Sequence, residues 1–391
     1  MPWHVSTLLP LLLTALIPPA LNSYYYPMGR GLLDYKFRHR LIFKITSLFL
    51  GLLVTQLSGC QIIPTINNGF HNSRISSENA VPVQFAFPFE LESGHDFYQG
   101  LAAVKLEGKW GYINQSGNWV IQPHFELADS FTEDLATVKV DGKWGYIDQT
   151  GNCVIKPQFD GAKSFAAGLA PVKQGDDWGY IDKTGTVIIL PQFHDADLFS
   201  EGLAIVENNN QYGYVDKTGN WIIPPQFQEA EPFSEGLATV KLNNQYGYID
   251  KTGNWAIPPQ FKDASSFSEG LASVTNQVMK SGYINHQGEF VIMPYFDWAG
   301  DFVQGVAGIS MNDKIGYIDQ QGNMLIVPQF DNTYNFSEDL IAVKIGDKWG
   351  YINKMGNLVI KPQFDSVWSF QQGVARVRID NRYAFISHPL Q

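Results

Sequence analysis

Cysteine and charged side chains are scarce in this chain of 391 residues. There are only two cysteines, Cys60 and Cys153, so a framework of disulfides cannot hold the fold, and packing with backbone pairing must do so. Charged residues make up 17% of the chain and hydrophobic residues 45%. This balance is typical of a folded region and excludes a fully disordered chain.

Basic charge, helical periodicity and metal-binding motifs are also lacking. The formal net charge is −11, and an acidic protein repels phosphate backbones, so we expect no nucleic-acid partner. No stretch after residue 60 keeps apolar residues at a spacing of 3.6, so little helix is predicted. The histidines form no HExxH motif and no close pair, so neither a metal nor another cofactor is expected.

The N-terminal part has the pattern of an export signal. Residues 28–59 contain a basic stretch, then the apolar run Ile45–Val54, then small residues. The run is shorter than the roughly 20 residues that a membrane-spanning helix needs. The four residues Leu57, Ser58, Gly59 and Cys60 follow it directly and resemble the lipobox of bacterial lipoproteins. This resemblance implies cleavage before Cys60 and lipid attachment to its sulfur.

The same resemblance divides the N-terminal region and predicts a location. We expect export, a lipid anchor in the membrane and, because Gln61 follows the cysteine in place of Asp, a position at the outer membrane or cell surface. Residues 60–80 are polar and read as a tether. Residues 1–27 are apolar and lack Lys and Arg, and we expect the natural start to be Met28.

Glycine, proline and aromatic residues, by contrast, are abundant and recur with a period. A Gly-Tyr pair repeats with a spacing of 34 residues, once 35. The glycines are Gly111, Gly145, Gly179, Gly213, Gly247, Gly282, Gly316 and Gly350. A fixed period over eight copies predicts a repeat architecture for residues 81–391.

Each copy contains three short runs that favour β-strands. In one copy they are Leu135–Val140, Trp144–Asp148 and Cys153–Phe159, each bounded by turn residues and rich in β-branched or aromatic side chains. The sequence therefore predicts an all-β tandem array of about nine three-stranded antiparallel units of ~34 residues. Three strands cannot bury these side chains alone, so neighbouring units must stack.

The ends of the array leave two arrangements open. The first unit has a third run without the preceding two, and the last unit, ending near "RYAFIS", lacks a third run. Units of three strands favour an open, β-solenoid-like array with atypical ends. Alternatively, the N-terminal run pairs with the C-terminal two strands and closes a propeller-like ring.

The repeats, such as "KWGYINQSGNWVIQPHF", resemble the WG-containing repeat, also called the KWG repeat, of bacterial surface and secreted proteins. The likeness covers roughly residues 89–386, with departures from Trp-Gly at Tyr212, Tyr246, Ser281 and Ile315. It implies a β-rich repeat array that is often exported, and it implies no defined reaction.

Two sets of repeated residues are candidate functional groups. The Asp or Asn of each "IDxxGN" turn is expected to hydrogen-bond its own turn and not to bind calcium. The recurring aromatics either form a buried ladder or, if exposed, stack on a sugar or peptide; a unique surface is expected in the irregular stretch 278–315. The recurring candidates are Trp110, Trp144, Trp178, Tyr212, Tyr246 and Trp349, and two further candidates, Tyr295 and Trp298, are extra aromatics that break the period.

No set of residues in the sequence forms a recognisable catalytic constellation. We therefore expect a non-catalytic, lipid-anchored envelope protein whose repeats present a surface for binding or scaffolding. The alternative is a glycan- or peptidoglycan-binding module that uses the aromatic rows. The expected partners are the membrane, through the lipid, and an envelope protein or glycan.

Overall fold

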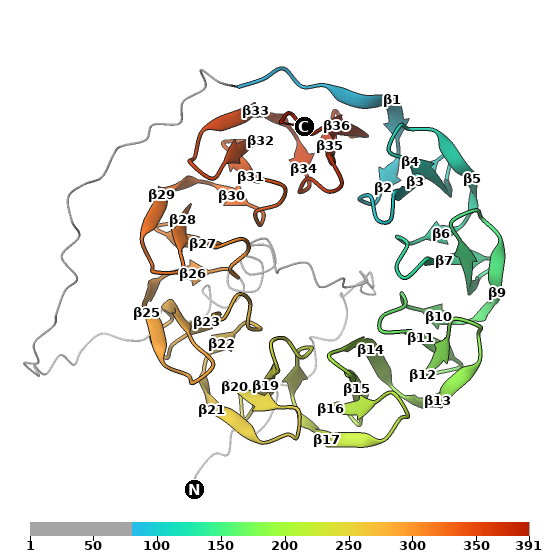
Figure 1. Cartoon of the computed structure of the whole chain (residues 1–391), viewed down its shortest axis with the longest axis horizontal. Coiled ribbons are helices and arrows are strands. Elements are labelled where there is room, and N and C mark those ends of the chain that lie inside the picture. The colour runs from blue at the N-terminus through green and yellow to red at the C-terminus, as the bar shows by residue number, and fades with distance from the viewer. Residues whose placement is uncertain (1–79, 391) are drawn as a thin grey trace, which may run out of the picture.

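The protein is a closed ring of nine β-sheets in the computed structural model, which describes residues 80–390 (Figure 1). Each sheet is a blade of four antiparallel strands, and the described residues contain no helix. The predicted all-β tandem array is confirmed. The ring is the closed arrangement that the sequence left as the alternative, not the open array it favoured.

The blades follow one another along the chain. Blade 1 contains β2 (Ser93–Gly94), β3 (Leu101–Leu106), β4 (Lys109–Asn114) and β5 (Trp119–Phe125). Blade 2 contains β6 (Leu127–Ala128), β7 (Leu135–Val140), β8 (Lys143–Asp148) and β9 (Cys153–Phe159). Blade 3 contains β10 (Gly161–Ala162), β11 (Leu169–Gln174), β12 (Asp177–Asp182) and β13 (Val187–Phe193).

Blades 4 to 6 repeat this order. Blade 4 contains β14 (Asp195–Ser200), β15 (Leu203–Asn208), β16 (Gln211–Asp216) and β17 (Trp221–Phe227). Blade 5 contains β18 (Glu229–Ala230), β19 (Leu237–Leu242), β20 (Gln245–Asp250) and β21 (Trp255–Phe261). Blade 6 contains β22 (Asp263–Ala264), β23 (Ala272–Thr275), β24 (Ser281–Ile284) and β25 (Phe290–Phe296).

The last three blades complete the ring. Blade 7 contains β26 (Trp298–Ala299), β27 (Val306–Met311), β28 (Lys314–Asp319) and β29 (Met324–Phe330). Blade 8 contains β30 (Asn332–Thr333), β31 (Leu340–Ile345), β32 (Lys348–Asn353) and β33 (Leu358–Phe364). Blade 9 contains β34 (Ser366–Val367), β35 (Val374–Ile379), β36 (Arg382–Ser387) and, as its outer strand, β1 (Phe85–Leu91).

The fourth strand of each blade was missed because it is very short. The innermost strand has two residues in eight of the nine blades, and Figure 1 shows these strands on the inner side of the ring. In blade 2 its ladder consists of the pairs Leu127–Lys139 and Ala128–Val138. A run of two residues carries no alternation that a sequence can reveal, so it read as part of a connector.

The ring closes where the first strand of the chain joins the last blade. β1 pairs antiparallel with β36, and the backbone N–H of Ser387 donates to the carbonyl of Gln84 at 2.9 Å. The outer strand of blade 9 therefore comes from the opposite end of the propeller chain. This pairing supplies the strand that the last repeat lacks, and it leaves no open end to the array.

Candidate binding surfaces

The predicted binding aromatics divide into buried and accessible side chains. Trp110, Trp144, Tyr246 and Trp349 are at most 7% exposed, so for these four the structure shows the buried ladder. Trp178, Tyr212 and Trp298 are half-buried. Tyr295 is 61% exposed and is the most accessible of the set.

The recurring Trp and Tyr residues are covered by side chains that come directly after the innermost strand of the same blade. The ring of His95 lies 4.9 Å from that of Trp110 in blade 1, and in blade 3 the ammonium of Lys163 lies 5.2 Å from the ring of Trp178. Burial, with a smaller effect from the positive charge of Arg376, lowers the pKa of His95 to about 4. His95 is therefore neutral near pH 7, because burial disfavours its charged form.

A second aromatic row joins each blade to the next. The hydroxyl of Tyr146 donates to the carbonyl of Lys163 in the following blade at 2.8 Å, and its ring packs on that of Phe165 at 4.9 Å. Burial raises the pKa of Tyr146 well above its ordinary value. Six more tyrosines donate to the same carbonyl position: Tyr112, Tyr180, Tyr214, Tyr248, Tyr283 and Tyr351.

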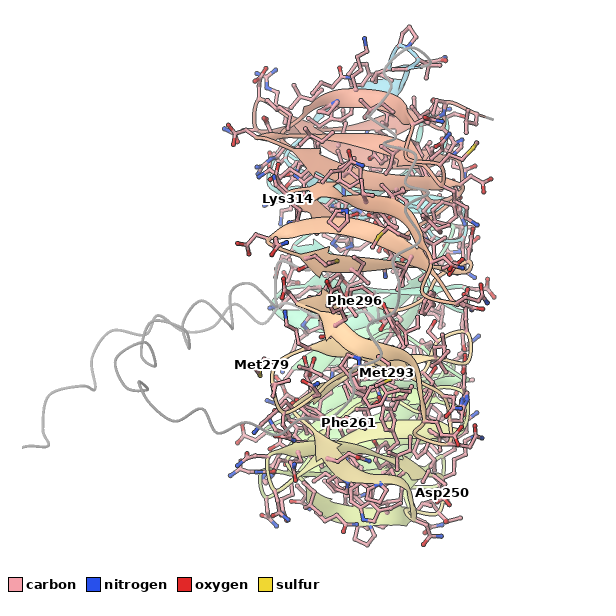
Figure 2. The ribbon with its side chains drawn as sticks, turned by 90° about the vertical axis from the view of Figure 1, so that its left-hand side faces the viewer. Asp250, Phe261, Met279, Met293, Phe296 and Lys314 are labelled. Atoms are coloured by element: carbon pink, nitrogen blue, oxygen red, sulfur yellow. The ribbon has the colours of Figure 1, made fainter. Side chains whose placement is uncertain are left out.

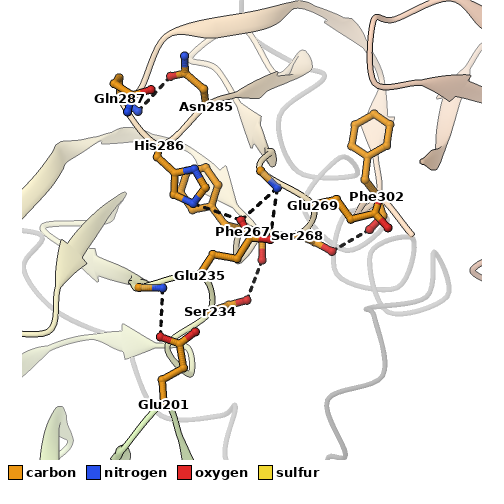
Figure 3. Close-up of polar contacts among 12 residues, drawn as sticks. Glu201, Ser234, Glu235, Phe267, Ser268, Glu269, Asn285, His286, Gln287 and Phe302 are labelled. Atoms are coloured by element: carbon orange, nitrogen blue, oxygen red, sulfur yellow. Dashed lines mark hydrogen bonds and ion pairs between the residues drawn. The ribbon is translucent and has the colours of Figure 1, made fainter. Parts of the chain in front are cut away.

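The two-residue turns after the innermost strands form a polar belt around the inner side of the ring. In blade 5 the carboxylate of Glu235 accepts the backbone N–H of Gly270, in blade 6, at 3.0 Å, and contacts Nε2 of His286 at 3.2 Å (Figure 3). The carboxylate of Glu201 makes the same two kinds of contact, with the N–H of Gly236 and with Lys251. These acidic residues are thus engaged in joining neighbouring blades.

The Asp residues of the "IDxxGN" turns serve their own turns. One carboxylate oxygen of Asp148 accepts the backbone N–H groups of Thr150 and Asn152, both at 2.9 Å. The hydroxyl of Thr150 donates to the same oxygen at 2.6 Å, and this bond is the main cause of the lowered pKa of Asp148. Among residues 80–390, no three His, Cys, Asp or Glu side chains lie together in a way that could hold a metal ion.

The joint between blades 9 and 1 is built differently from the other joints, which sequence reasoning missed. Phe385 stands where the other blades have the joining tyrosine. Nε of Arg376 instead lies 3.4 Å from a carboxylate oxygen of Asp96 in blade 1, and both side chains are about one-tenth exposed. The guanidinium also lies 3.9 Å above the ring of Trp368. The sequence does mark this joint, because the position of Arg376 holds an uncharged residue in every other blade, for example Ala103 or Thr137.

A cluster of exposed apolar residues on blade 6 was also missed in part. The sequence singled out Tyr295, but Val278, Val291 and Met293 are likewise exposed, at 75%, 48% and 68%. Val291, Met293 and Tyr295 lie in β25, the outer strand of the blade, and Val278 lies in the turn between β23 and β24. Comparing the same position in every repeat identifies Met293 and Tyr295, since they replace residues that are polar or proline in most copies.

Two predictions about cysteine have different outcomes. The position of Cys153 holds apolar residues in the other repeats, which predicts a packed thiol; this prediction is wrong, because Cys153 is exposed at the start of β9. Cys60, together with Leu57, Ser58 and Gly59, lies outside the described residues. So do the signal region 28–59, residues 1–27 and all but the end of the tether. Within residues 80–390 no helix is long and apolar enough to span a membrane.

Solved structures resemble this chain at low sequence identity. A structure titled as a eukaryotic initiation factor has a TM-score of 0.52 and 10% identity, covering 79% of this chain and 93% of that chain. At this identity the likeness concerns the fold alone. BamB from Moraxella catarrhalis has a TM-score of 0.42 and 10% identity, covering 65% and 94%. A search of curated proteins finds no match.

A family of repeats accounts for nearly the whole ring. The model of the WG containing repeat matches nine consecutive segments: 84–110, 110–144, 144–176, 178–212, 212–246, 246–276, 282–314, 315–349 and 349–383. These segments follow the period of the blades, and the glycine after each Trp or Tyr packs against the outer strand of the same blade. The chain therefore belongs to the WG-containing repeat family.

Proposed function

We propose that this protein is a non-catalytic, lipid-anchored component of the bacterial envelope whose propeller is a surface for binding or scaffolding. One observation carries the binding role: the residues that recur along the repeats are engaged within the ring, where they join blades, close turns or pack strands of one blade together. The hydroxyl of Tyr146, like that of its equivalents, donates to a backbone carbonyl of the next blade. The carboxylates of Glu201 and Glu235 each accept a backbone N–H from the corresponding turn of the next blade. The residues that differ between blades are then left for recognition.

The anchor part of the proposal is supported by the sequence and by where the chain enters the ring. Leu57, Ser58 and Gly59 before Cys60 fit a lipobox, and residues 61–79 are polar. The described chain starts at the outer edge of blade 8, where the N–H of Val81 donates to the carbonyl of Val359. An anchor attached there leaves both faces of the ring accessible.

The test of the anchor compares the two cysteines of the chain. Cys60→Ala should release the protein from membranes into the soluble fraction, whereas Cys153→Ala should leave it membrane-bound. Mass spectrometry of the wild-type protein should show lipid on Cys60. Retention of the Cys60→Ala protein on membranes would contradict the anchor.

Glycan binding is a second candidate because one aromatic side chain is openly accessible. Tyr295 presents 61% of its surface, and sugars stack on exposed aromatic rings. The four buried members of the row cannot offer a ring face without opening the ladder. If peptidoglycan fragments shift the aromatic fluorescence of the wild-type protein but not of Tyr295→Gln, this second candidate is supported; no shift in either protein counts against it.

A further inference from the structure

The outer edge of blade 6 carries an apolar surface that the fold does not explain. We call it the blade 6 rim and define it by Val291, Met293 and Tyr295 of β25; Val278 and Met279, in the turn between β23 and β24, are further exposed apolar residues of the same blade. Figure 2 views the ring edge-on and shows Met279 and Met293 on the blade that faces the viewer. Single exposed apolar residues are common, but Val291, Met293 and Tyr295 are alternate residues of one edge strand and are all exposed, and exposed apolar residues gathered at one place mark an interaction site.

Comparison of the repeats shows that these side chains are not required for folding. The position of Tyr295 is polar in the seven other complete repeats, where it holds His124, Gln158, Gln192, Gln226, Gln260, Gln329 and Gln363. The position of Met293 is held elsewhere by Gln122, Lys156, Leu190, Pro224, Pro258, Val327 and Lys361. Since the same blade forms with Gln or Lys at these positions, the apolar pair of blade 6 serves something other than its own sheet.

The backbone of the blade 6 rim is also suited to pairing. β25 is the edge strand of its sheet, so one side of its backbone faces outward. Blades 4 and 5 have Pro224 and Pro258 at the position of Met293, and proline has no N–H. The sheet therefore does not use this N–H, and in blade 6 it can bond an added strand.

The chain itself shows how such an edge is occupied. At blade 8 the N–H of Val81 donates to the carbonyl of Val359 at 2.9 Å, and Val81 and Val83 pack against the core of blades 8 and 9. Val359 is only 6% exposed there, whereas its counterpart Val291 in blade 6 is 48% exposed. An extended Val-Pro-Val segment is thus an occupant that this type of edge accepts.

Charge at the blade 6 rim points to an apolar occupant. Lys280 and Asp297 pair with each other at 2.6 Å beside the rim, so neither offers an uncompensated charge to a ligand. The thioether side chain of Met293 adapts to differently shaped apolar partners.

We propose that the blade 6 rim binds an extended apolar segment of a partner protein, which pairs with β25 as an additional strand. Alternate side chains of that segment cover Val291, Met293 and Tyr295, as in other complexes formed by strand addition. The proposal deepens the binding role proposed above and does not depend on the lipid anchor.

The probe for this site is a fluorescent peptide with the sequence of residues 80–86, the segment that occupies the edge of blade 8. It is added to the full-length chain purified in detergent, and binding is followed by fluorescence anisotropy. Met293→Pro and Tyr295→Gln introduce residues that other blades already carry, and each should weaken binding about tenfold or more. Leu190→Lys removes an exposed apolar residue at the position of Met293 in blade 3 and should leave binding unchanged.

Hydrogen exchange locates the bound peptide and separates the possible occupants. Slower exchange of the backbone N–H of Met293 on peptide binding is the expected result. The proposal is overturned if the peptide does not bind, if Met293→Pro and Tyr295→Gln bind as well as wild type, or if Leu190→Lys weakens binding equally. It is also overturned if the rim instead joins two copies of this chain, seen as a dimer that Met293→Pro dissociates, or if a peptidoglycan fragment displaces the peptide.

The same experiment remains informative whatever the result for the anchor. Cys60→Ala protein should bind the peptide as tightly as wild type. A failure of the anchor would therefore leave this result intact, and a failure of peptide binding would leave the anchor intact.

Discussion

At the scale of single residues, the glycine of the Trp-Gly pair is explained by the proline of the outer strand. The register between β8 and β9 pairs Trp144 with Phe159 and Tyr146 with Ile155, so the outer strand carries extra residues around Pro157. This bulge presses the outer strand onto Gly145, where a Cβ atom would lie 2.6 Å from the nitrogen of Pro157. The motif is therefore a packing unit within one blade.

Replacement of this glycine should be costly. Gly145→Ala would place its Cβ 2.5 Å from the carbonyl oxygen of Ile155, so the two strands must separate, and we expect a loss of about 1–3 kcal/mol in the free energy of unfolding. Gly308→Ala is the control, because its Cβ would meet nothing closer than 3.6 Å. Urea denaturation of both variants checks this; equal midpoints would contradict the explanation.

The joining tyrosines predict a specific response to alkaline pH. Burial raises the pKa of six of them above the ordinary value of 10.0: Tyr146, Tyr180, Tyr214, Tyr248, Tyr283 and Tyr351. It does the same for Tyr317, whose hydroxyl contacts that of Thr333 in the next blade. The folded protein thus keeps protons that the unfolded chain releases. Stability should be complete below about pH 10 and fall as the pH rises further.

Tyrosinate absorbance measured together with circular dichroism tests this response. The buried tyrosines should ionise only as the β-sheet signal is lost, in one coincident transition. Ionisation of all tyrosines with an intact sheet signal would show that their hydroxyls are not buried between blades.

At the scale of elements, the sequence predicts the long strands well and the joints poorly. Leu135–Val140 and Cys153–Phe159 were predicted with the bounds that they have in the structure, because β-branched residues and flanking turns mark them. The innermost strands have too few residues to show a run of β-branched side chains between two turns. Closure depends on β1 and β36, which lie at opposite ends of the array. The incomplete first and last units indicated this pairing as the alternative, but no local pattern favoured it over an open array.

The candidate site was predictable only where one repeat departs from the others. Tyr295 stands out in the sequence because it departs from the repeat. Met293 does not stand out, because the residue type at its position varies from blade to blade. Burial of Trp110 and Trp144 could not be predicted, since an aromatic residue in a strand serves equally well inside or outside. The exposure of such an aromatic side chain depends on how the residues around it pack in the assembled ring. The sequence of a single repeat does not contain that information.

The joint between blades 9 and 1 yields a prediction at this scale. Arg376→Ala leaves the carboxylate of Asp96 buried without its partner, and we expect a loss of about 3–5 kcal/mol. The double variant Asp96→Ser with Arg376→Ala gives this joint the small side chains of other blades, such as Ser130 and Ala342, and should recover much of that loss. Thermal denaturation of the single and double variants measures the difference; strictly additive losses would contradict the pairing.

At the scale of the whole molecule, a ring assembled from near-identical joints separates stability from recognition. Most blades contact the next through a tyrosine hydroxyl and an aromatic pair, and several also through a turn carboxylate, as in the contacts of Tyr214 with Glu231 and Phe233 and of Glu201 with Gly236. Substitutions on the outer strands leave these contacts intact. The outer edges can therefore vary from blade to blade, which is where the blade 6 rim lies.

Closure of the ring is the central claim, and cross-linking of its two ends tests it most directly. Gln84 and Ser387 are joined by a backbone hydrogen bond of 2.9 Å between β36 and the residue just before β1. In a chain in which Cys60 and Cys153 are replaced by Ala, Gln84→Cys and Ser387→Cys should be joined almost completely within one molecule by a short thiol cross-linker. Thiols that remain unlinked in the folded monomer, or that link only between molecules, would show that the array is open.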